Sequence, residues 1–161
     1  MSATWTFAQL VDLLQTQLQA DAGILAFDPV PEIRVSVPHA AESISDIIAL
    51  GIDAGDDDKI QTALGSHSHD EEVTVGCLAA VIRYGSGDVE AKTARDRVLA
   101  FLDVVDEHLR ETPIVLGAST LRAPRVENRT FESFPSIVGE NQAVRVARIS
   151  FDITYKARTT P

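Results

Sequence analysis

Apolar residues recur at helical spacing near the start of the chain. One helical face would hold Phe7, Leu10, Val11, Leu14 and Leu18. The spacing predicts a helix over residues 6–20 whose apolar face packs into a core. Thr6, followed three positions later by Gln9, resembles a capping box, and we therefore place the start of the helix at Thr6.

The next region is extended rather than helical. Three prolines between residues 28 and 45 exclude a continuous helix. Ile33, Val35 and Val37 alternate with polar residues, a pattern that predicts a short strand. A second apolar stretch runs from Ile47 to Ile52, and an acidic turn follows at residues 53–58.

The strongest strand pattern covers Val73 to Tyr84. One face would hold Val73, Val75, Cys77, Ala79 and Val81, and the other Leu78, Ala80, Ile82 and Tyr84. Because both faces are apolar, we expect a central strand that is covered on both sides. The wholly polar run before it, Gly65–Glu72, is expected to form a loop that either becomes ordered against a neighbouring protein or stays a solvated tip.

A long amphipathic helix is predicted from residue 88 to about residue 111. Its apolar face would hold Ala91, Ala94, Val98, Phe101, Leu102, Val105 and Leu109. Its polar face would hold Glu90, Arg97, Asp103, Asp106, Glu107 and Arg110. Pro113 ends the helix.

The C-terminal part is predicted to be extended. Residues 119–134 form an Arg-rich segment with a possible turn near Glu127-Asn128, and residues 139–142 form a hairpin turn. In the last strand, Ala143–Ala157, apolar residues switch from even positions (144, 146) to odd ones (149–155). Either a bulge near residue 147 resets the register, or the even set covers a second surface. We favour the second surface, which a subunit contact could use.

These elements predict one domain, residues 1–161, of mixed α/β (α+β) class. Its sheet should be largely antiparallel and flanked by two main helices. The pattern of the C-terminal half predicts a hairpin, and the sequence shows no strand–helix–strand alternation. No apolar run is long enough for a membrane span, and the N-terminus lacks a signal-peptide pattern. A cytoplasmic protein is expected.

Charge is distributed unevenly along the chain, whose formal net charge is −10. Residues 1–58 carry ten acids and one base, Arg34, a net of −9, which argues against binding nucleic acid through its phosphates. Residues 113–161 carry seven bases against four acids. Such a division either provides complementary faces between subunits or simply keeps the protein in solution.

Three segments could hold a ligand, and each also has a simpler interpretation. His67 and His69, with the acidic residues 70–72, could bind a divalent metal, and Asp53 with residues 56–58 could bind calcium. Solvated loops explain both better. Gly85-Ser86-Gly87 lies where phosphate loops occur, but it is too short and no lysine follows it. No catalytic set emerges, so we expect no enzyme and assign no catalytic, cofactor-binding or metal-binding residue.

The ordered set of elements resembles the tail terminator (tail completion) family of long-tailed, siphophage-type bacteriophages. The resemblance covers the strand at 73–84, the helix through residues 91–105, the small-residue turn at 116–118, a turn centred on Gly139 and a last strand ending in Phe151–Ala157. The predicted N-terminal helix matches the same family's opening. None of these motifs is specific by itself.

The resemblance implies a structural protein of the virion tail or neck, present in the host cytoplasm during assembly. Family members form hexameric rings that cap the tail tube and then join the head connector, with the genomic DNA only passing through the lumen. The implied partners are further copies of the chain, the tail tube protein and the head–tail connector protein, with no membrane and no cofactor. Another neck protein, the tube protein itself, or a small α/β enzyme or ligand-binding protein remain as alternatives.

Overall fold

The computed structural model describes residues 3–35, 46–51, 69–85, 87–116 and 119–159. The helices are α1 (Ala3–Ala20), α2 (Ala22–Leu25) and α3 (Asp88–Glu111). The strands are β1 (Glu32–Arg34), β2 (Asp46–Leu50), β3 (His69–Tyr84), β4 (Ile114–Leu116), β5 (Ser119–Val138) and β6 (Gln142–Thr159).

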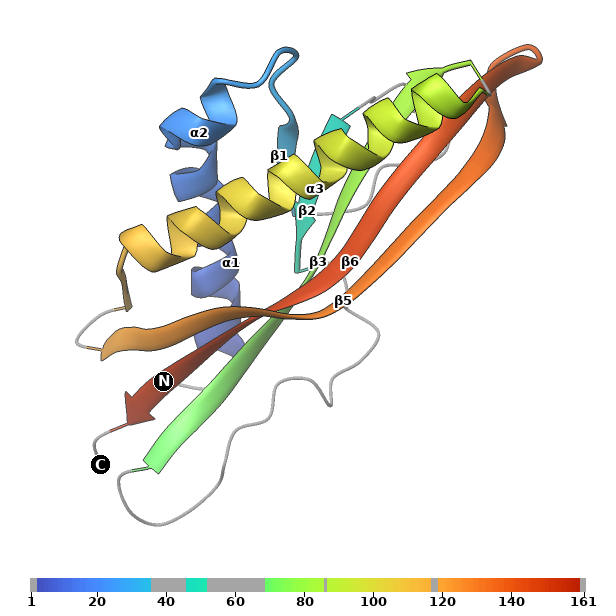
Figure 1. Cartoon of the computed structure of the whole chain (residues 1–161). Helices are drawn as coiled ribbons and strands as arrows, with labels where there is room; N and C mark the ends of the chain where they lie inside the picture. Colours follow the sequence, from blue (N-terminus) through green and yellow to red (C-terminus); the bar gives the residue numbers. More distant parts are fainter. Residues whose placement is uncertain (1–2, 36–45, 52–68, 86, 117–118, 160–161) are drawn as a thin grey trace.

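The strands form one six-stranded sheet in the order β1-β2-β3-β6-β5-β4. β1 and β2 pair in parallel, whereas every other neighbouring pair is antiparallel. Figure 1 shows the long strands β3, β6 and β5 crossing the molecule with α3 in front of them. The predicted α+β class with a largely antiparallel sheet is confirmed.

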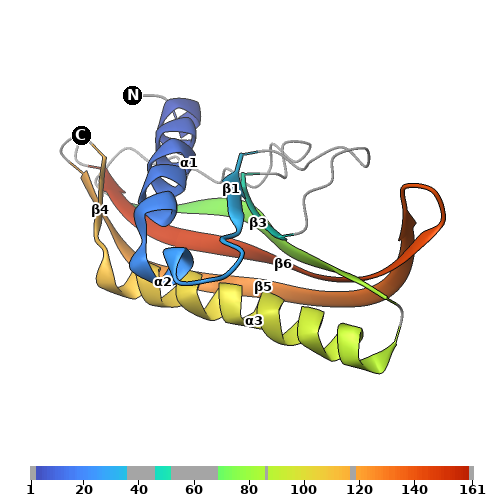
Figure 2. The same cartoon turned by 90° about the horizontal axis from the view of Figure 1, so that it is seen from above.

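The helices share one face of this sheet. α3 contacts β3, β6 and β5, and α1 contacts β1 and β2 near one edge as well as β4 at the other. The sheet must therefore curl so that both of its edges approach α1. Figure 2 shows α3 lying along the sheet while α1 runs across its end. The core fills the space between them and includes Phe101, Phe151 and Tyr155.

α1 begins three residues earlier than expected. The predicted inward residues Leu10, Val11, Leu14 and Leu18 are all buried. Thr6 lies inside the helix and not at its N-cap, so the capping-box prediction is wrong. No glycine or proline stops the helix from extending toward Ala3.

β3 and β6 pair without a break, from His69 opposite Thr159 to Tyr84 opposite Val144. No bulge interrupts β6 in this ladder, so Val144 and Val146 lie on the face opposite Phe151 and the other odd-numbered residues. Val144 is fully buried there. The register excludes the bulge near residue 147 and places Val144 and Val146 on the second face, whereas the use of this face in a subunit contact stays a prediction.

β3 is central, as predicted, but its two faces differ. The odd-numbered residues from Val73 to Val81 are buried against the helices. The even-numbered residues Leu78, Ala80 and Ile82 are only half-buried, and Tyr84 is 63% exposed. The expectation of a strand covered on both sides therefore holds for the face toward the helices, whereas the second face is only partly covered.

The strand also begins earlier than expected. Residues 69–72 belong to β3 and pair with the end of β6, so the predicted loop Gly65–Glu72 is wrong for these residues. Residues 65–68 lie outside the described residues. Pairing supplies main-chain hydrogen bonds, and it sets Glu72 opposite Lys156 and Asp70 opposite Arg158 in register. Main-chain pairing with β6 therefore forms a strand that the polar sequence alone does not suggest.

β5 contains no chain reversal near residue 128. The predicted turn at Glu127-Asn128 is a bulge within one long strand, since the register to β6 shifts between Glu127 and Thr130. Asn128 has a φ of 55°, a conformation that asparagine tolerates better than most residues. The reversal occurs at residues 139–141, as predicted, with positive φ at Gly139 and Asn141.

Candidate functional site

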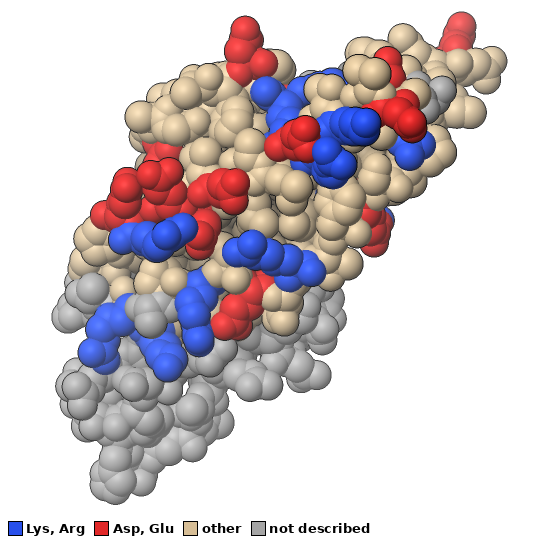
Figure 3. Space-filling view, in the orientation of Figure 1, with Lys and Arg blue, Asp and Glu red and all other residues tan. Residues whose placement is uncertain are grey.

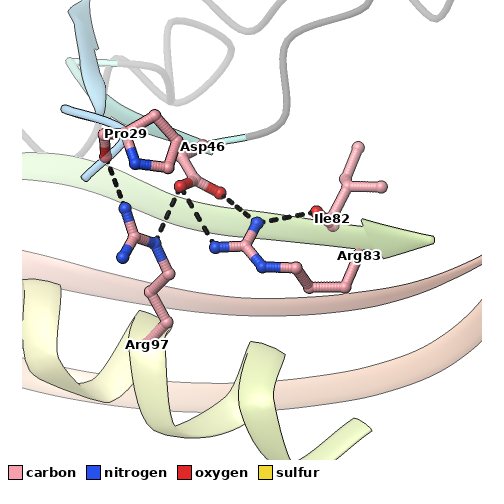
Figure 4. A network of polar contacts seen from close by, with 5 residues as sticks. All are labelled: Pro29, Asp46, Ile82, Arg83 and Arg97. Atoms are coloured by element: carbon pink, nitrogen blue, oxygen red, sulfur yellow. Dashed lines mark hydrogen bonds and ion pairs between the residues drawn. The ribbon is translucent and has the colours of Figure 1, made fainter. Parts of the chain in front are cut away.

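A buried carboxylate joins three parts of the fold. Asp46 Oδ1 accepts a hydrogen bond from Arg83 Nη1 at 2.8 Å, and Asp46 Oδ2 accepts one from Arg97 Nε at 2.8 Å. The Asp46 side chain is only 2% exposed. Figure 4 shows the two guanidinium groups reaching the carboxylate from β3 and from α3.

Arg97 makes further contacts that fix its position. It donates a short hydrogen bond to the carbonyl oxygen of Pro29, before β1. Its guanidinium carbon lies 5.4 Å from the centre of the Phe27 ring and 5.2 Å from that of Phe101. These cation–π contacts offset part of the cost of removing the charge from water. Arg97 was expected on the polar face of α3, and this expectation is wrong.

The arrangement indicates a structural role for this network. Both carboxylate oxygens already accept charge-assisted hydrogen bonds, so Asp46 has little capacity left to bind a substrate. The network instead ties β2 and the chain near Pro29 to β3 and α3. Sequence reasoning missed it, although Arg97 stands four positions before the buried Phe101 and so flanks the apolar face.

A second polar cluster lies where α1, α2 and α3 meet. His108 is buried on α3, with Nδ1 at 2.7 Å from Asp21 Oδ2 and Nε2 at 3.1 Å from Gln17 Oε1. Asp21 is also the N-cap of α2, because its Oδ1 accepts hydrogen bonds from the main-chain N–H groups of Gly23 and Ile24. His108 was not assigned to the apolar face, yet its spacing of three from Val105 places it there.

The pKa of Asp21 is held below its ordinary value. Burial alone would raise this pKa, but the hydrogen bonds from His108, Ile24 and Gly23 favour the ionised form and outweigh it. The carboxylate is thus a stable anion that orients His108 and caps α2. This cluster positions the helices α1, α2 and α3 relative to one another.

The two candidate metal-binding segments fall largely outside the described residues. His67 and residues 53–58 lie outside the described residues, and the side chain of His69 is not described. Within the described ranges, no group of three or more His, Cys, Asp or Glu side chains could hold a metal ion.

The glycine turn before α3 faces a carboxylate. A Cβ atom added to Gly85 or Gly87 would come within 2.9 Å of side-chain atoms of Glu90. The Glu90 carboxylate would repel a phosphate bound at this turn. The same carboxylate is favourable beside the N-terminus of α3, where the helix dipole is positive. These contacts support the interpretation of a turn.

The single cysteine is shielded. Cys77 is 2% exposed on the core face of β3, and burial raises its pKa far above the ordinary range. A thiol held neutral and inaccessible in this way is a poor nucleophile. It acts as a small apolar core residue.

A cavity of about 360 Å³ lies at the C-terminal end of α3. Its apolar part is formed by Leu109, Ile114, Leu121 and Tyr155, all buried side chains. Two exposed arginines, Arg110 and Arg122, also line it. The Tyr155 hydroxyl is buried without a hydrogen-bond partner among the described residues, and burial raises its pKa. The cavity offers apolar surface and positive charge but few polar groups to orient a small molecule.

The opposite end of the molecule is a protruding hairpin. β3 ends opposite Val144 and the Gly85 N–H donates a hydrogen bond to the Ala143 carbonyl oxygen, whereas residues 137–142 belong to the tip of the β5–β6 hairpin. Figures 1 and 2 both show it extending past the start of α3. Ile137, next to the turn, is 68% exposed.

The free edge of β5 is protected. β4 pairs with Ser119–Leu121, and within the described part of the chain the rest of β5 pairs with β6 alone. This edge is interrupted by two bulges and by several charged residues. It also contains two prolines, Pro124 and Pro135. Such features oppose unspecific strand addition.

Charges of opposite sign lie side by side near the cavity. Figure 3 shows acidic side chains gathered over the C-terminal half of α3 and basic side chains beside them, over the start of β5. The exposed bases include Arg122, Arg125 and Lys156, and Arg122 stands opposite Lys156 in register. The described surface therefore carries patches of both signs.

No model of a known protein family matches the sequence, and no curated protein matches it either. Among the described residues, no helix is both long enough and apolar enough to cross a membrane. Functional inference therefore rests on the arrangement of elements and on the surfaces described above.

Proposed function

We propose that the chain is the tail terminator of a long-tailed bacteriophage, a structural protein without catalytic activity. In this role it forms a ring, hexameric in the family that it resembles, on the end of the tail tube. The ring stops further addition of tube protein and presents a surface to the head–tail connector protein. DNA passes through the lumen without being bound specifically.

The observation that supports the proposal best is the order and length of the C-terminal elements. A 16-residue β3 leads into a 24-residue α3, and two long strands then form the closing hairpin. This is the sequence of elements on which the resemblance rests. The two polar clusters in the described interior bind protein groups to one another, as a structural subunit requires.

The surfaces also suit a ring. A ring uses heterologous contacts, in which two different patches of one subunit meet. This chain has an exposed apolar side chain at one end and an apolar cavity lined by arginines at the other. Its net charge of −10 would disfavour adhesion of passing DNA.

Electron microscopy of the purified chain, alone and mixed with preformed tail tubes, tests the proposal. We expect closed rings on tube ends and no further growth of capped tubes when tube protein is added. Long tubes formed by the chain alone would identify the tube protein instead. Binding to neither end of the tubes, with no effect on their growth, would contradict the proposal.

A further inference from the structure

We infer that the tip of the β5–β6 hairpin of one copy inserts Ile137 into the cavity at the C-terminal end of α3 of the next copy. The inference rests on the proposed ring and deepens it, because it names the two surfaces that meet. The contact would be head-to-tail, since the two surfaces lie at opposite ends of each copy.

The distance between the two surfaces comes from α3. The hairpin projects beyond the first turn of this helix, and the cavity is formed by residues at its last turn and beyond (Figure 1). A helix of 24 residues is about 36 Å long at 1.5 Å per residue. One copy therefore cannot fill its own cavity with its own hairpin, and a second copy must supply the hairpin.

The apolar chemistry of the two surfaces is complementary. Ile137 is more exposed than almost any other large apolar side chain in the described residues. The cavity presents Leu109, Ile114, Leu121 and the Tyr155 ring. Its volume of about 360 Å³ accepts a side chain together with neighbouring atoms of the hairpin. Burial would remove the exposed Ile137 side chain from water, which favours association.

The charges are complementary as well. Between Ile137 and Val144 the hairpin carries one charged residue, Glu140. The cavity is lined by Arg110 and Arg122. Arg110 also pairs with Asp106 within the same copy. An incoming Glu140 would place its carboxylate beside the guanidinium groups that line the cavity, which would orient the hairpin.

A small-molecule ligand explains the cavity less well. Sites for small molecules usually combine an apolar lining with several polar groups that fix the orientation of the ligand. Here the Tyr155 hydroxyl is buried away from the accessible surface, and the charged groups are long exposed side chains. A protein segment, which its own backbone already orients, needs fewer such groups.

Cysteine cross-linking between copies tests the contact. Ile137→Cys and Pro113→Cys place one thiol on the hairpin and one at the cavity, and the native Cys77 is too deeply buried to compete. Mixing the two full-length variants under mild oxidation should give mixed disulfide dimers. The double variant should give a ladder of dimers, trimers and larger species. Arg110→Cys serves as a second cavity position if Pro113→Cys does not fold.

Val89→Cys provides the control, because Val89 is 73% exposed and lies at the start of α3, away from the cavity. The pair Ile137→Cys and Pro113→Cys should cross-link at least about tenfold faster than the pair Val89→Cys and Pro113→Cys. Equal rates would overturn the contact, as would dimers formed mainly between two hairpins.

Ile137→Ser should weaken self-association by about ten- to a hundredfold, as expected for losing one buried aliphatic side chain.

Failure of this contact and failure of the proposed function give different results. If Ile137→Ser still caps tail tubes and the cross-link is absent, the contact is wrong and the terminator role stands. If the cross-linked ladder forms but tubes are never capped, the contact is right and the proposed role is wrong.

Discussion

The Asp46 carboxylate forms ion pairs with the guanidinium groups of Arg83 and Arg97. The side chains of these two arginines are 23% and 16% exposed, respectively. Asp46→Asn keeps the size of the side chain and removes the charge, leaving Arg83 and Arg97 without their common anion. Breaking a buried ion pair in this way costs about 3–5 kcal/mol, and partial access to water favours the lower end. We expect a loss of about 3 kcal/mol in the free energy of unfolding, measured by urea denaturation.

Asp106→Asn is the matched control for this loss. It removes an exposed pair with Arg110 one turn away on α3. Exposed pairs of this kind contribute about 0–1 kcal/mol. Equal losses in the two variants would contradict a structural role for the buried network.

Asp21 gives the stability of the protein a dependence on acid pH. Its folded-state pKa is depressed, so its contribution is complete above the ordinary pKa of about 4 and is lost as the pH falls through the lower folded value. Asp21→Asn retains an N-cap for α2 but removes the charge that faces His108. We expect it to cost about 1–2 kcal/mol near pH 6, as for a hydrogen bond to a charged group.

The difference between wild type and Asp21→Asn should then shrink below pH 4. Urea midpoints measured from pH 3 to pH 7 provide the comparison. Asp12→Asn, at an exposed position of α1, is the control and should change the midpoint little. A constant difference across this pH range would show that the carboxylate charge is not what stabilises the folded protein.

Among the elements, α2 packs very closely on α3. A Cβ atom at Gly23 would lie 2.9 Å from Val104 Cγ1 and 3.0 Å from Asp21 Oδ1. Gly23→Ala would normally favour a helix, but here the two helices must move apart or Val104 must shift. We expect a net loss of about 1–2 kcal/mol in the free energy of unfolding.

Val104→Ala offers a way to check the cause of this loss. If the clash with Val104 is responsible, the double variant Gly23→Ala, Val104→Ala should lose less than the two single losses added together. Additive losses would show that Gly23 is needed for another reason. Thermal unfolding of the four proteins completes the cycle.

Elements flanked by clear local signals could be predicted from the sequence. α3 has its predicted bounds because Gly87 marks its start, Pro113 follows its end, and a continuous apolar stripe runs between them. The change of face in β6 was likewise readable from the positions of Val144 and Phe151. In contrast, the bulge at Asn128 resembled a turn, because a positive φ suits both structures.

The polar clusters could not be predicted because they join residues far apart in the sequence. Arg97 lies 51 positions from Asp46, and His108 lies 87 positions from Asp21. A local pattern shows only that Arg97 flanks the apolar stripe and that His108 falls on it. The identity of each partner depends on how the strands and helices pack together.

At the scale of the whole molecule, self-association opposes a large charge. Each copy carries a net −10, and this repulsion acts over about 30 Å at 0.01 M salt but only about 10 Å at 0.1 M. An exposed Glu–Arg contact such as Glu140 with Arg122 contributes about 0–1 kcal/mol. Repulsion should therefore dominate at low salt, and the apolar contact of Ile137 should persist as salt rises.

We consequently expect association to strengthen between 0.01 M and 0.3 M salt, as measured by light scattering over a range of protein concentrations. Two variants separate net charge from the specific contact: Glu140→Arg and Asp103→Arg each change the net charge from −10 to −8. Asp103 is exposed on α3 and keeps the hairpin intact, so Asp103→Arg should associate more strongly than wild type at low salt. Glu140→Arg gains the same relief from repulsion but brings a cation to the arginines of the cavity, so it should associate more weakly than Asp103→Arg. Identical behaviour of the two variants would mean that only net charge matters and that the hairpin makes no oriented contact.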